Sequence, residues 1–399
     1  MLSTRFSTIL PGLRQAALAA AAALGLAACA TAPRTAGVDD GIPVDVNQPV
    51  RVALLVPYGS GDPGREQIAR SLENAARLAV SDLRNASIDL VVYPSAGTTS
   101  GGSAAASQAV AEGAKMIVGP LFSTETAGAA SPAAQGGLTV LSFSNNPSVA
   151  GGNVYILGTT FENTADRLVS YGQSRGLGNF GVVYPSGLEG ETARDAVITA
   201  VGQRGANLTT SQPYNLSVEG IQAAAGPIAA ALNGSGTNAV VLTDGPTGGL
   251  AFISEALRGN GVSADIAQFM GMQRWDVSAE ALAVPSLQGG VYAAPDPALL
   301  GAFEGRYQTA YGESPHELAG LAYDSIAAVG ALIAQARSQG GSPFSTARLT
   351  QPAGFAGVNG PFRFGQSGRS QRNLAIIEVR NGQPVVTERA ARSFDAVAF

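Results

Sequence analysis

The chain has 399 residues, of which 45% are hydrophobic and 13% are charged, and its formal net charge is −5. This apolar content excludes wholesale disorder and an integral membrane protein with several spans, and a chain of this length usually forms two lobes. The acidic balance argues against nucleic-acid binding. A single His and a single Cys exclude a disulfide framework and a zinc site built from Cys and His.

The N-terminus carries Arg5 and Arg14 and then an apolar run over residues 16–28. As a helix this run would span about 20 Å, which is too short for a hydrocarbon core of about 30 Å. We therefore predict a secretory signal peptide over residues 1–28.

The sequence Leu-Ala-Ala-Cys that ends at Cys29 resembles a bacterial lipobox. The resemblance implies that Cys29 is acylated and becomes the mature N-terminus, with membrane contact through this lipid anchor only. Ala30, in place of an Asp after the cysteine, implies the periplasmic face of the outer membrane. The alternative is an ordinary signal peptide that happens to contain a cysteine.

Residues 29–49 include Pro33, Pro43 and Pro49 and show no apolar period, so we predict a flexible tether. After the tether, short runs rich in β-formers alternate with helical patterns. Strands are expected at 51–57, 88–93, 116–119, 139–143 and 154–157, and helices at 68–83, 103–112 and 126–135. This alternation predicts right-handed βαβ crossovers and a parallel sheet.

The same alternation begins again after Gly158. Helices are expected at 163–174, 191–204, 250–258, 298–311 and 317–334, and strands at 180–184, 239–242, 268–271, 290–293, 360–364 and 374–380. Asn381-Gly382 predicts a turn after the last of these strands. The predicted fold class is α/β, with two doubly wound Rossmann-like lobes.

The motifs of the chain carry no recognisable catalytic apparatus. Residues 59–64 match G-x-G-x-x-G after a strand, but no acidic residue ends the second strand, so a flexible loop is favoured over a dinucleotide site. No P-loop, H-E-x-x-H, EF-hand or G-x-S-x-G motif occurs. His316 stands at a predicted helix start, where a capping or surface role is favoured over catalysis. We therefore predict that the protein is not an enzyme and uses no cofactor or metal.

Two polar loops, 119–125 and 142–147, follow the third and fourth strands. Ligands of open parallel sheets bind outside these strand ends. The hydroxyls of Ser123 and Thr124, together with free N–H groups of the next helix, suit a carboxylate or another acceptor. The alternative is that both hydroxyls cap a helix opening near Thr126, and the sequence favours neither.

These loops resemble those of the type I periplasmic binding protein family, in its leucine/isoleucine/valine-binding branch. The matching stretches are 117–123, 140–147, 321–324 and 357–362. The resemblance implies two lobes joined by three hinge crossovers, which we place near 157–161, 293–297 and 355–360. The N-terminal lobe then comprises 50–158 plus 297–355, and the C-terminal lobe 159–296 plus 356–399.

The resemblance also implies a ligand cleft between the lobes. In amino-acid-binding members the two polar loops hold the ligand carboxylate and ammonium, and the other lobe adds an acidic residue. Here Gln273 stands where that acid would be, which argues against a free amino acid because a buried ammonium without a carboxylate is costly. The candidate cleft residues are Tyr58, Ser123, Thr124, Ser144, Asn145, Asn146, Gln273, Trp275, Tyr323 and Asp324.

Within the family the lipobox, the Pro-rich tether and the two loops look most like the penicillin-binding protein activators. This implies a lipid-anchored protein that regulates peptidoglycan synthesis by contact with a class A penicillin-binding protein. The alternative is the substrate-binding lipoprotein of an ABC importer, which would deliver a small polar ligand such as an amino acid, amide or small peptide to an ABC permease.

Overall fold

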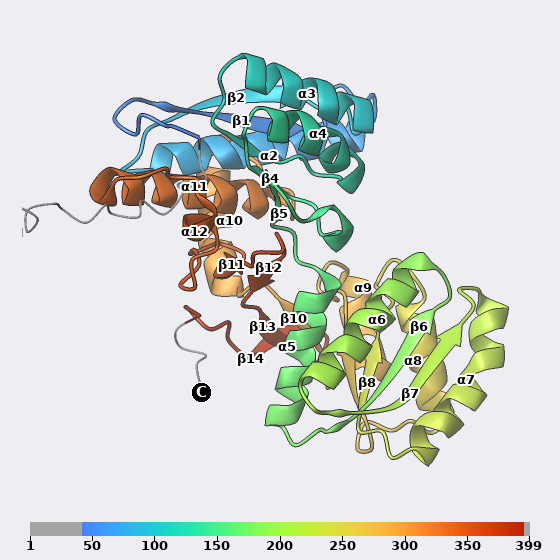
Figure 1. The fold of residues 1–399 in the computed structure, drawn as a ribbon. Helices are drawn as coiled ribbons and strands as arrows, with labels where there is room; N and C mark the ends of the chain where they lie inside the picture. Colours follow the sequence, from blue (N-terminus) through green and yellow to red (C-terminus); the bar gives the residue numbers. More distant parts are fainter. Residues whose placement is uncertain (1–41, 395–399) are drawn as a thin grey trace, which may run out of the picture. The chain divides into compact units, whose positions relative to one another are not determined.

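The N-terminal lobe is built on a parallel five-stranded sheet in the order β2-β1-β3-β4-β5 (Figure 1). The computed structural model describes residues 42–394. The strands are β1 (Val50–Val56), β2 (Ile88–Pro94), β3 (Met116–Val118), β4 (Val140–Ser142) and β5 (Val154–Ile156). All are short apolar runs, as expected for strands that are covered on both faces.

Helices cover both faces of this sheet because side chains along each strand alternate between the faces. The helices of this lobe are α2 (Pro63–Asp82), α3 (Thr99–Ala111), α4 (Ser123–Gln135), α10 (Pro297–Tyr311), α11 (Ala319–Gln339) and α12 (Thr346–Leu349). On β1, Val52 and Leu54 join the core beneath α2 and α11, whereas Leu55 joins the core beneath α3 and α4. Helix α11 is long and apolar enough to cross a membrane, but most of it is buried in this core.

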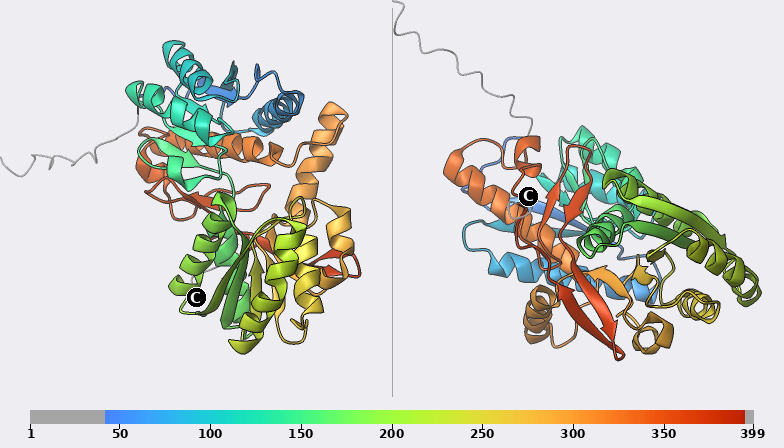
Figure 2. Two further views of the ribbon diagram at one scale, coloured as in Figure 1. Left: turned by 90° about the vertical axis from the view of Figure 1, so that its right-hand side faces the viewer. Right: turned by 90° about the horizontal axis from the view of Figure 1, so that it is seen from below.

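The C-terminal lobe has a seven-stranded sheet in the order β14-β13-β10-β9-β8-β6-β7. Its strands are β6 (Asn179–Pro185), β7 (Asn207–Tyr214), β8 (Ala239–Leu242), β9 (Gln268–Gly271), β10 (Val291–Ala294), β13 (Ala375–Arg380) and β14 (Gln383–Glu388). The strands from β7 to β10 are parallel, and β13 and β14 add an antiparallel hairpin at the edge, drawn in red in Figure 2.

Two helix layers cover this second sheet as well. Helices α5 (Phe161–Ser174) and α6 (Leu188–Gln203) pack on the face that carries Val241, and α7 (Val218–Gly234) and α8 (Leu250–Gly259) pack on the face that carries Leu242. The short helices α9 (Ala279–Ala283) and η2 (Pro285–Leu287) also belong to this lobe, whereas η1 (Pro147–Val149) lies between β4 and β5 in the N-terminal lobe. The predicted fold class, α/β with two doubly wound lobes, is confirmed.

The third crossover differs from the prediction. Strands β11 (Phe362–Phe364) and β12 (Ser370–Arg372) pair with each other and not with β13. The rings of Phe362 and Phe364 pack with Phe355 in the core of the N-terminal lobe. Residues 356–372, predicted to lie in the C-terminal lobe, therefore belong to the N-terminal lobe, and the chain crosses at 372–375 and not at 355–360.

The end of the predicted tether is packed against the N-terminal lobe. Ile42, Val44 and Val46 lie half-buried against its apolar core, and Arg337 Nε donates a hydrogen bond of 3.1 Å to the carbonyl oxygen of Val46. Residues 42–49 therefore pack against the lobe and do not form the flexible tether that the sequence predicts. The predicted signal peptide, Cys29 and the rest of the tether lie outside the described residues.

Candidate functional site

A cavity of about 380 Å³ is lined by residues of both lobes. Most of its wall is apolar, which is typical of small-molecule sites. The apolar lining residues are Leu121, Phe122, Phe143, Phe161, Met272, Ala293, Ala294, Pro295, Leu318, Leu321 and Leu374. The polar ones are Asn145, Thr159, Thr164, Arg274, Glu317 and Asn359, and Gly158 completes the wall.

A buried carboxylate fixes the first loop of this wall. Glu125 accepts hydrogen bonds from the Ser95 hydroxyl (2.5 Å), the Gly97 N–H (2.8 Å) and the Phe122 N–H (2.9 Å). The loop also needs glycine at position 119, where φ is +82° and a Cβ would lie 2.2 Å from the Leu55 carbonyl oxygen. Together these contacts hold the aromatic ring of Phe122 at the cavity.

The second loop is held by its own hydroxyl groups. Ser142 Oγ lies 2.7 Å from Thr126 Oγ1 and accepts a 3.1 Å hydrogen bond from the Ser144 N–H. Ser144 Oγ in turn accepts one of 3.1 Å from the Asn146 N–H. These serine hydroxyls therefore stabilise the loop itself, and Phe143 and Asn145 are the residues that it presents to the cavity.

The charged part of the wall comes from both lobes. Arg274 forms a two-point ion pair with Asp276, with both N–O distances at 3.0 Å. Burial alone would lower the pKa of Arg274, but the hydrogen bonds to Asp276 raise it above its ordinary value. Glu317 lines the same cavity and its charge also acts on Arg274. Two carboxylates thus surround one guanidinium.

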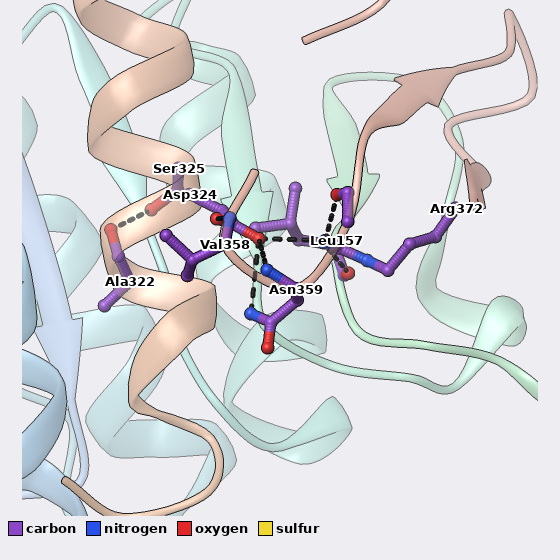
Figure 3. Close-up of polar contacts among 8 residues, drawn as sticks. Leu157, Ala322, Asp324, Ser325, Val358, Asn359 and Arg372 are labelled. Atoms are coloured by element: carbon purple, nitrogen blue, oxygen red, sulfur yellow. Dashed lines mark hydrogen bonds and ion pairs between the residues drawn. The ribbon is translucent and has the colours of Figure 1, made fainter. Parts of the chain in front are cut away.

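Next to the cavity, the crossovers are tied by a buried ion pair (Figure 3). Arg372 Nη1 lies 2.8 Å from Asp324 Oδ2, and both side chains are fully buried. Arg372 also donates to the carbonyl oxygens of Gly360 (3.0 Å) and Leu157 (3.2 Å). Asp324 Oδ1 accepts a 2.6 Å hydrogen bond from the Val358 N–H. The pair therefore joins α11 to the ends of the first and third crossovers.

Most, but not all, of the hydrogen-bonding groups of this ion pair have a partner. Asn359 Nδ2 donates to Asp324 (3.2 Å), and the Arg372 guanidinium stacks on Phe362 at 4.8 Å from the ring centroid. Arg372 Nε has no hydrogen-bond partner among the described residues. Burial raises the pKa of Asp324, while the charge of Arg372 opposes that rise. The ion pair therefore stabilises the crossovers, and neither of its side chains lines the cavity.

The structure brings one of the ten predicted cleft residues, Asn145, to the cavity wall. Ser123 and Thr124 lie in the first turn of α4, and neither caps that helix, which begins after Phe122. Ser144 and Asn146 stabilise their own loop, the latter by accepting from the Ser148 N–H.

The other predicted residues lie elsewhere. Tyr58 donates to Glu73 (2.9 Å) and Tyr323 donates to Asp82 (2.7 Å), both on α2. Gln273 Nε2 makes only long contacts of 3.4 Å, to Glu189 and to the Thr243 carbonyl oxygen.

Trp275 belongs to the core of the C-terminal lobe, where it is fully buried. Space for its ring exists because Gly271 and Gly290 have no side chains, since a Cβ there would lie 2.3 and 2.8 Å from ring atoms. Phe122, Phe143 and Arg274 were not predicted to line the cleft, although the first two lie in the predicted polar loops and Arg274 lies between the predicted Gln273 and Trp275.

Catalytic and metal chemistry gain no support from the described residues. Within 42–394 no group of three or more His, Cys, Asp or Glu could hold a metal ion. His316 Nδ1 accepts a 3.2 Å hydrogen bond from the Leu318 N–H, which is a local capping role.

The comparison with protein families is decided by one match that covers most of the chain. Residues 49–384 match the family model described as "Periplasmic binding protein". The chain belongs to the periplasmic binding protein family. This family consists of substrate-binding proteins and not of enzymes. No curated protein sequence gives a significant match.

Many solved structures share the fold. A candidate branched-chain amino acid ABC transporter protein from Rhodospirillum rubrum is 18% identical with a TM-score of 0.70, covering 85% of this chain and 100% of its own. A substrate-binding protein from Desulfitobacterium hafniense in complex with Leu is 18% identical with a TM-score of 0.61, at 85% and 100% coverage. A solute-binding protein from R. palustris in complex with benzoate is 18% identical with a TM-score of 0.55, at 87% and 97% coverage. At this identity the likeness establishes the type I binding-protein fold.

Proposed function

We propose that this chain is the substrate-binding lipoprotein of an ABC importer and takes a small ligand into the cavity between its lobes. The observation that carries the proposal is a preformed cavity with walls from both lobes at the carboxyl ends of the strands. The related solved structures, which are ABC transporter binding proteins, support the same function.

The wall of the cavity indicates the ligand chemistry. Phe122, Phe143 and Phe161 contribute three aromatic rings, so the body of the ligand is apolar. Polar contacts are restricted to Asn145, the threonines, Asn359 and the Arg274–Glu317 region. A small apolar molecule with one polar end, such as an amide or a short peptide with an apolar side chain, fits this lining better than a free, uncapped amino acid.

A second candidate function is activation of a class A penicillin-binding protein by contact. The observation that favours it concerns the two loops that hold the ligand in amino-acid-binding relatives. In this chain polar side chains of both loops already form hydrogen bonds within the protein. Here the hydroxyls of Ser142 and Ser144 bind groups of their own loop and of α4, and the carboxylate of Glu125 binds Ser95 and the Phe122 N–H. Gln273 also leaves the ammonium site without its acid. A fold that retains lobes but not ligand groups suits a docking protein.

A titration separates the two candidates. Purified protein is titrated calorimetrically with branched-chain amino acids, their amides, dipeptides, benzoate and muropeptides. The receptor function predicts micromolar binding of one compound, weakened at least tenfold by Phe143→Ala and unchanged by Ile266→Ser, which lies away from the cavity. No binding, together with stimulation of glycan polymerisation by a purified class A penicillin-binding protein, would establish the activator instead.

The membrane of residence gives an independent test. We propose that Cys29 carries the lipid anchor. The outer-membrane expectation drawn from Ala30 and the receptor function predict different membranes. An importer's receptor must reach a permease in the inner membrane, so inner-membrane fractionation favours the receptor and outer-membrane fractionation favours the activator. Cys29→Ser should release the protein from both membranes, because the acyl chains supply the anchoring free energy. A membrane-bound Cys29→Ser variant would contradict the lipid anchor.

A further inference from the structure

One end of the N-terminal lobe carries cations that no acidic side chain neutralises. This is the end at which the strands of its sheet begin, on the side away from the cavity. None of these cations forms an ion pair with another described residue. They are Arg84 before β2, Lys115 before β3, Arg337 in the last turn of α11 and Arg348 in α12. We call these four residues the basic end.

The four residues belong to one surface. Arg337 Nη1 donates a 3.1 Å hydrogen bond to the carbonyl oxygen of Asn85, the residue that follows Arg84. Arg348 Nη1 donates one of 3.4 Å to a glutamine side chain at the C-terminal end of α11. Strand β1 pairs with both β2 and β3, so the segments that lead into these two strands, with Arg84 and Lys115, lie about 10 Å apart.

The acids near the basic end do not cancel its charge. Asp82 and Asp89 are already paired with arginines outside the group of four. Among the described residues of this end, Asp45 and Glu112 are the acids without an ion pair. Residues 30–41 add one arginine and two aspartates, which leaves the balance positive. Residues 325–377 contain five arginines and no acid. This end is therefore positively charged, although the whole chain has a net charge of −5.

The chain enters the lobe at the basic end. Arg337 Nε donates a 3.1 Å hydrogen bond to the carbonyl oxygen of Val46, and the Ser342 hydroxyl donates one of 3.2 Å to that of Ile42. Thirteen peptide bonds separate Cys29 from Ile42, so their Cα atoms lie at most about 45 Å apart. The inference rests on the lipid anchor of the proposed function, which keeps the basic end within this reach of a bilayer.

The far end of the molecule lies in the C-terminal lobe. The carboxyl ends of the parallel strands of both lobes lie at the cavity, so the strands of the C-terminal lobe begin at the end away from the basic end. This lobe also exposes acids that form no ion pair within the described part of the chain, such as Glu191, Glu219 and Glu255. An anionic surface attracts the basic end and repels these acids.

We propose that the basic end binds the anionic headgroups of the bilayer that holds Cys29, so that the cavity opens away from this bilayer. Juxtamembrane Lys and Arg side chains are attracted to anionic lipid over a Debye length, which is about 10 Å at 0.1 M salt. The short connection to Cys29 brings the four cations into this range. In this orientation the cavity is open to ligand on the side away from the membrane, and high salt releases the lobe.

The single lysine of the chain serves as a reporter of this contact. Unacylated full-length protein is coupled through its only cysteine, Cys29, to a maleimide lipid in vesicles of phosphatidylethanolamine with either phosphatidylglycerol or phosphatidylcholine. The protein carries Ile266→Lys, so that a water-soluble amine reagent labels Lys115 and the far end in one molecule. We expect labelling of Lys115 to be at least about threefold slower on phosphatidylglycerol vesicles, and about 1 M salt to remove the difference. Labelling at position 266 should be equal on both.

Matched charge reversals test the side chains. Arg84→Glu removes a cation whose guanidinium forms no ion pair in residues 42–394, and Arg175→Glu makes the same change at the far end, beside Ile266. We expect Arg84→Glu to abolish most of the protection of Lys115, and Arg175→Glu to leave it unchanged.

Three results would overturn the proposal: equal labelling of Lys115 on both kinds of vesicle, equal effects of the two reversals, or protection on phosphatidylcholine vesicles that rises with protein density. The last result would mean that protein, and not lipid, covers the basic end. Because the coupling is chemical, the experiment works whether or not Cys29 is acylated in the cell. The mass of the N-terminal peptide of the cellular protein tests the acylation separately, so failure of the anchor and failure of the lipid contact are distinguishable.

Discussion

The two lobes share one architecture but differ in how many large apolar side chains they expose to solvent. In the N-terminal lobe α3 and α4 approach each other closely, and Leu299 on α10, at 37%, is the one exposed large apolar side chain of its described residues. In the C-terminal lobe the same kind of sheet ends in loops that expose Leu188, Leu216 and Phe252. Each lobe ties its strand-end loops with a buried carboxylate, Glu125 in one and Asp244 in the other. The difference therefore concerns the outer surface and not the framework.

The largest expected effect tests the link between the lobes. Arg372→Met should lower the free energy of unfolding by about 3–5 kcal/mol, because it leaves Asp324 buried without a partner charge. Urea unfolding monitored by tryptophan fluorescence measures this loss. In the double variant with Asp324→Leu part of the loss should return, and a double variant less stable than Arg372→Met would show that the backbone groups around the pair matter more than its charges.

The pH dependence of Arg372→Met provides a second test. Burial raises the pKa of Asp324 above its unfolded value of about 4, and without Arg372 nothing of opposite charge counters that rise. A carboxyl group with a raised folded-state pKa stabilises the fold below the unfolded pKa and loses this contribution as the pH rises through the folded one. The gap between wild type and Arg372→Met should therefore narrow between pH 7 and pH 4. A constant gap would mean that Asp324 is hydrated in the variant.

Matched glycines measure the difference in helix packing. A Cβ at Gly128 on α4 would lie 1.9 Å from the Thr99 carbonyl oxygen of α3, so Gly128→Ala should cost about 1–3 kcal/mol through overpacking. A Cβ at Gly202 on α6 would have no atom within 4 Å, and Gly202→Ala should gain about 0.5–1 kcal/mol. Thermal unfolding of both variants gives the two signs. Equal effects would show that the contact between α3 and α4 is no tighter than the surroundings of Gly202.

Some of the fold could be predicted from the sequence because the strands that are covered on both faces are continuous apolar runs. Strand β7 was missed because it is an edge strand, and its Thr, Ser and Gln side chains show no apolar pattern. The third crossover was misplaced because Phe362 and Phe364 alternate like a core strand, although they pair only with the short β12.

Less of the site could be predicted, because the site depends on which side chains of each loop point into the cavity. Asn145 was found from its position after a strand. Trp275 has the same kind of position, but Gly271 and Gly290 leave space for its ring in the core. Asp324 was selected as a ligand group, and its buried partner Arg372 is distant in sequence. No local pattern marks such long-range pairs.

The smallest expected effect concerns Leu188, the most exposed large apolar side chain of residues 42–394. Leu188→Ser should change the free energy of unfolding by less than about 0.5 kcal/mol, because a side chain that is 86% exposed contributes little apolar burial to lose. Chemical denaturation compares it with Leu216→Ser, which removes a residue that also touches the loop before α8. A loss above about 1 kcal/mol for Leu188→Ser would mean that this side chain is covered in solution, since only buried apolar area produces such a cost. The C-terminal lobe would then not expose the side chain on which its contrast with the N-terminal lobe chiefly rests.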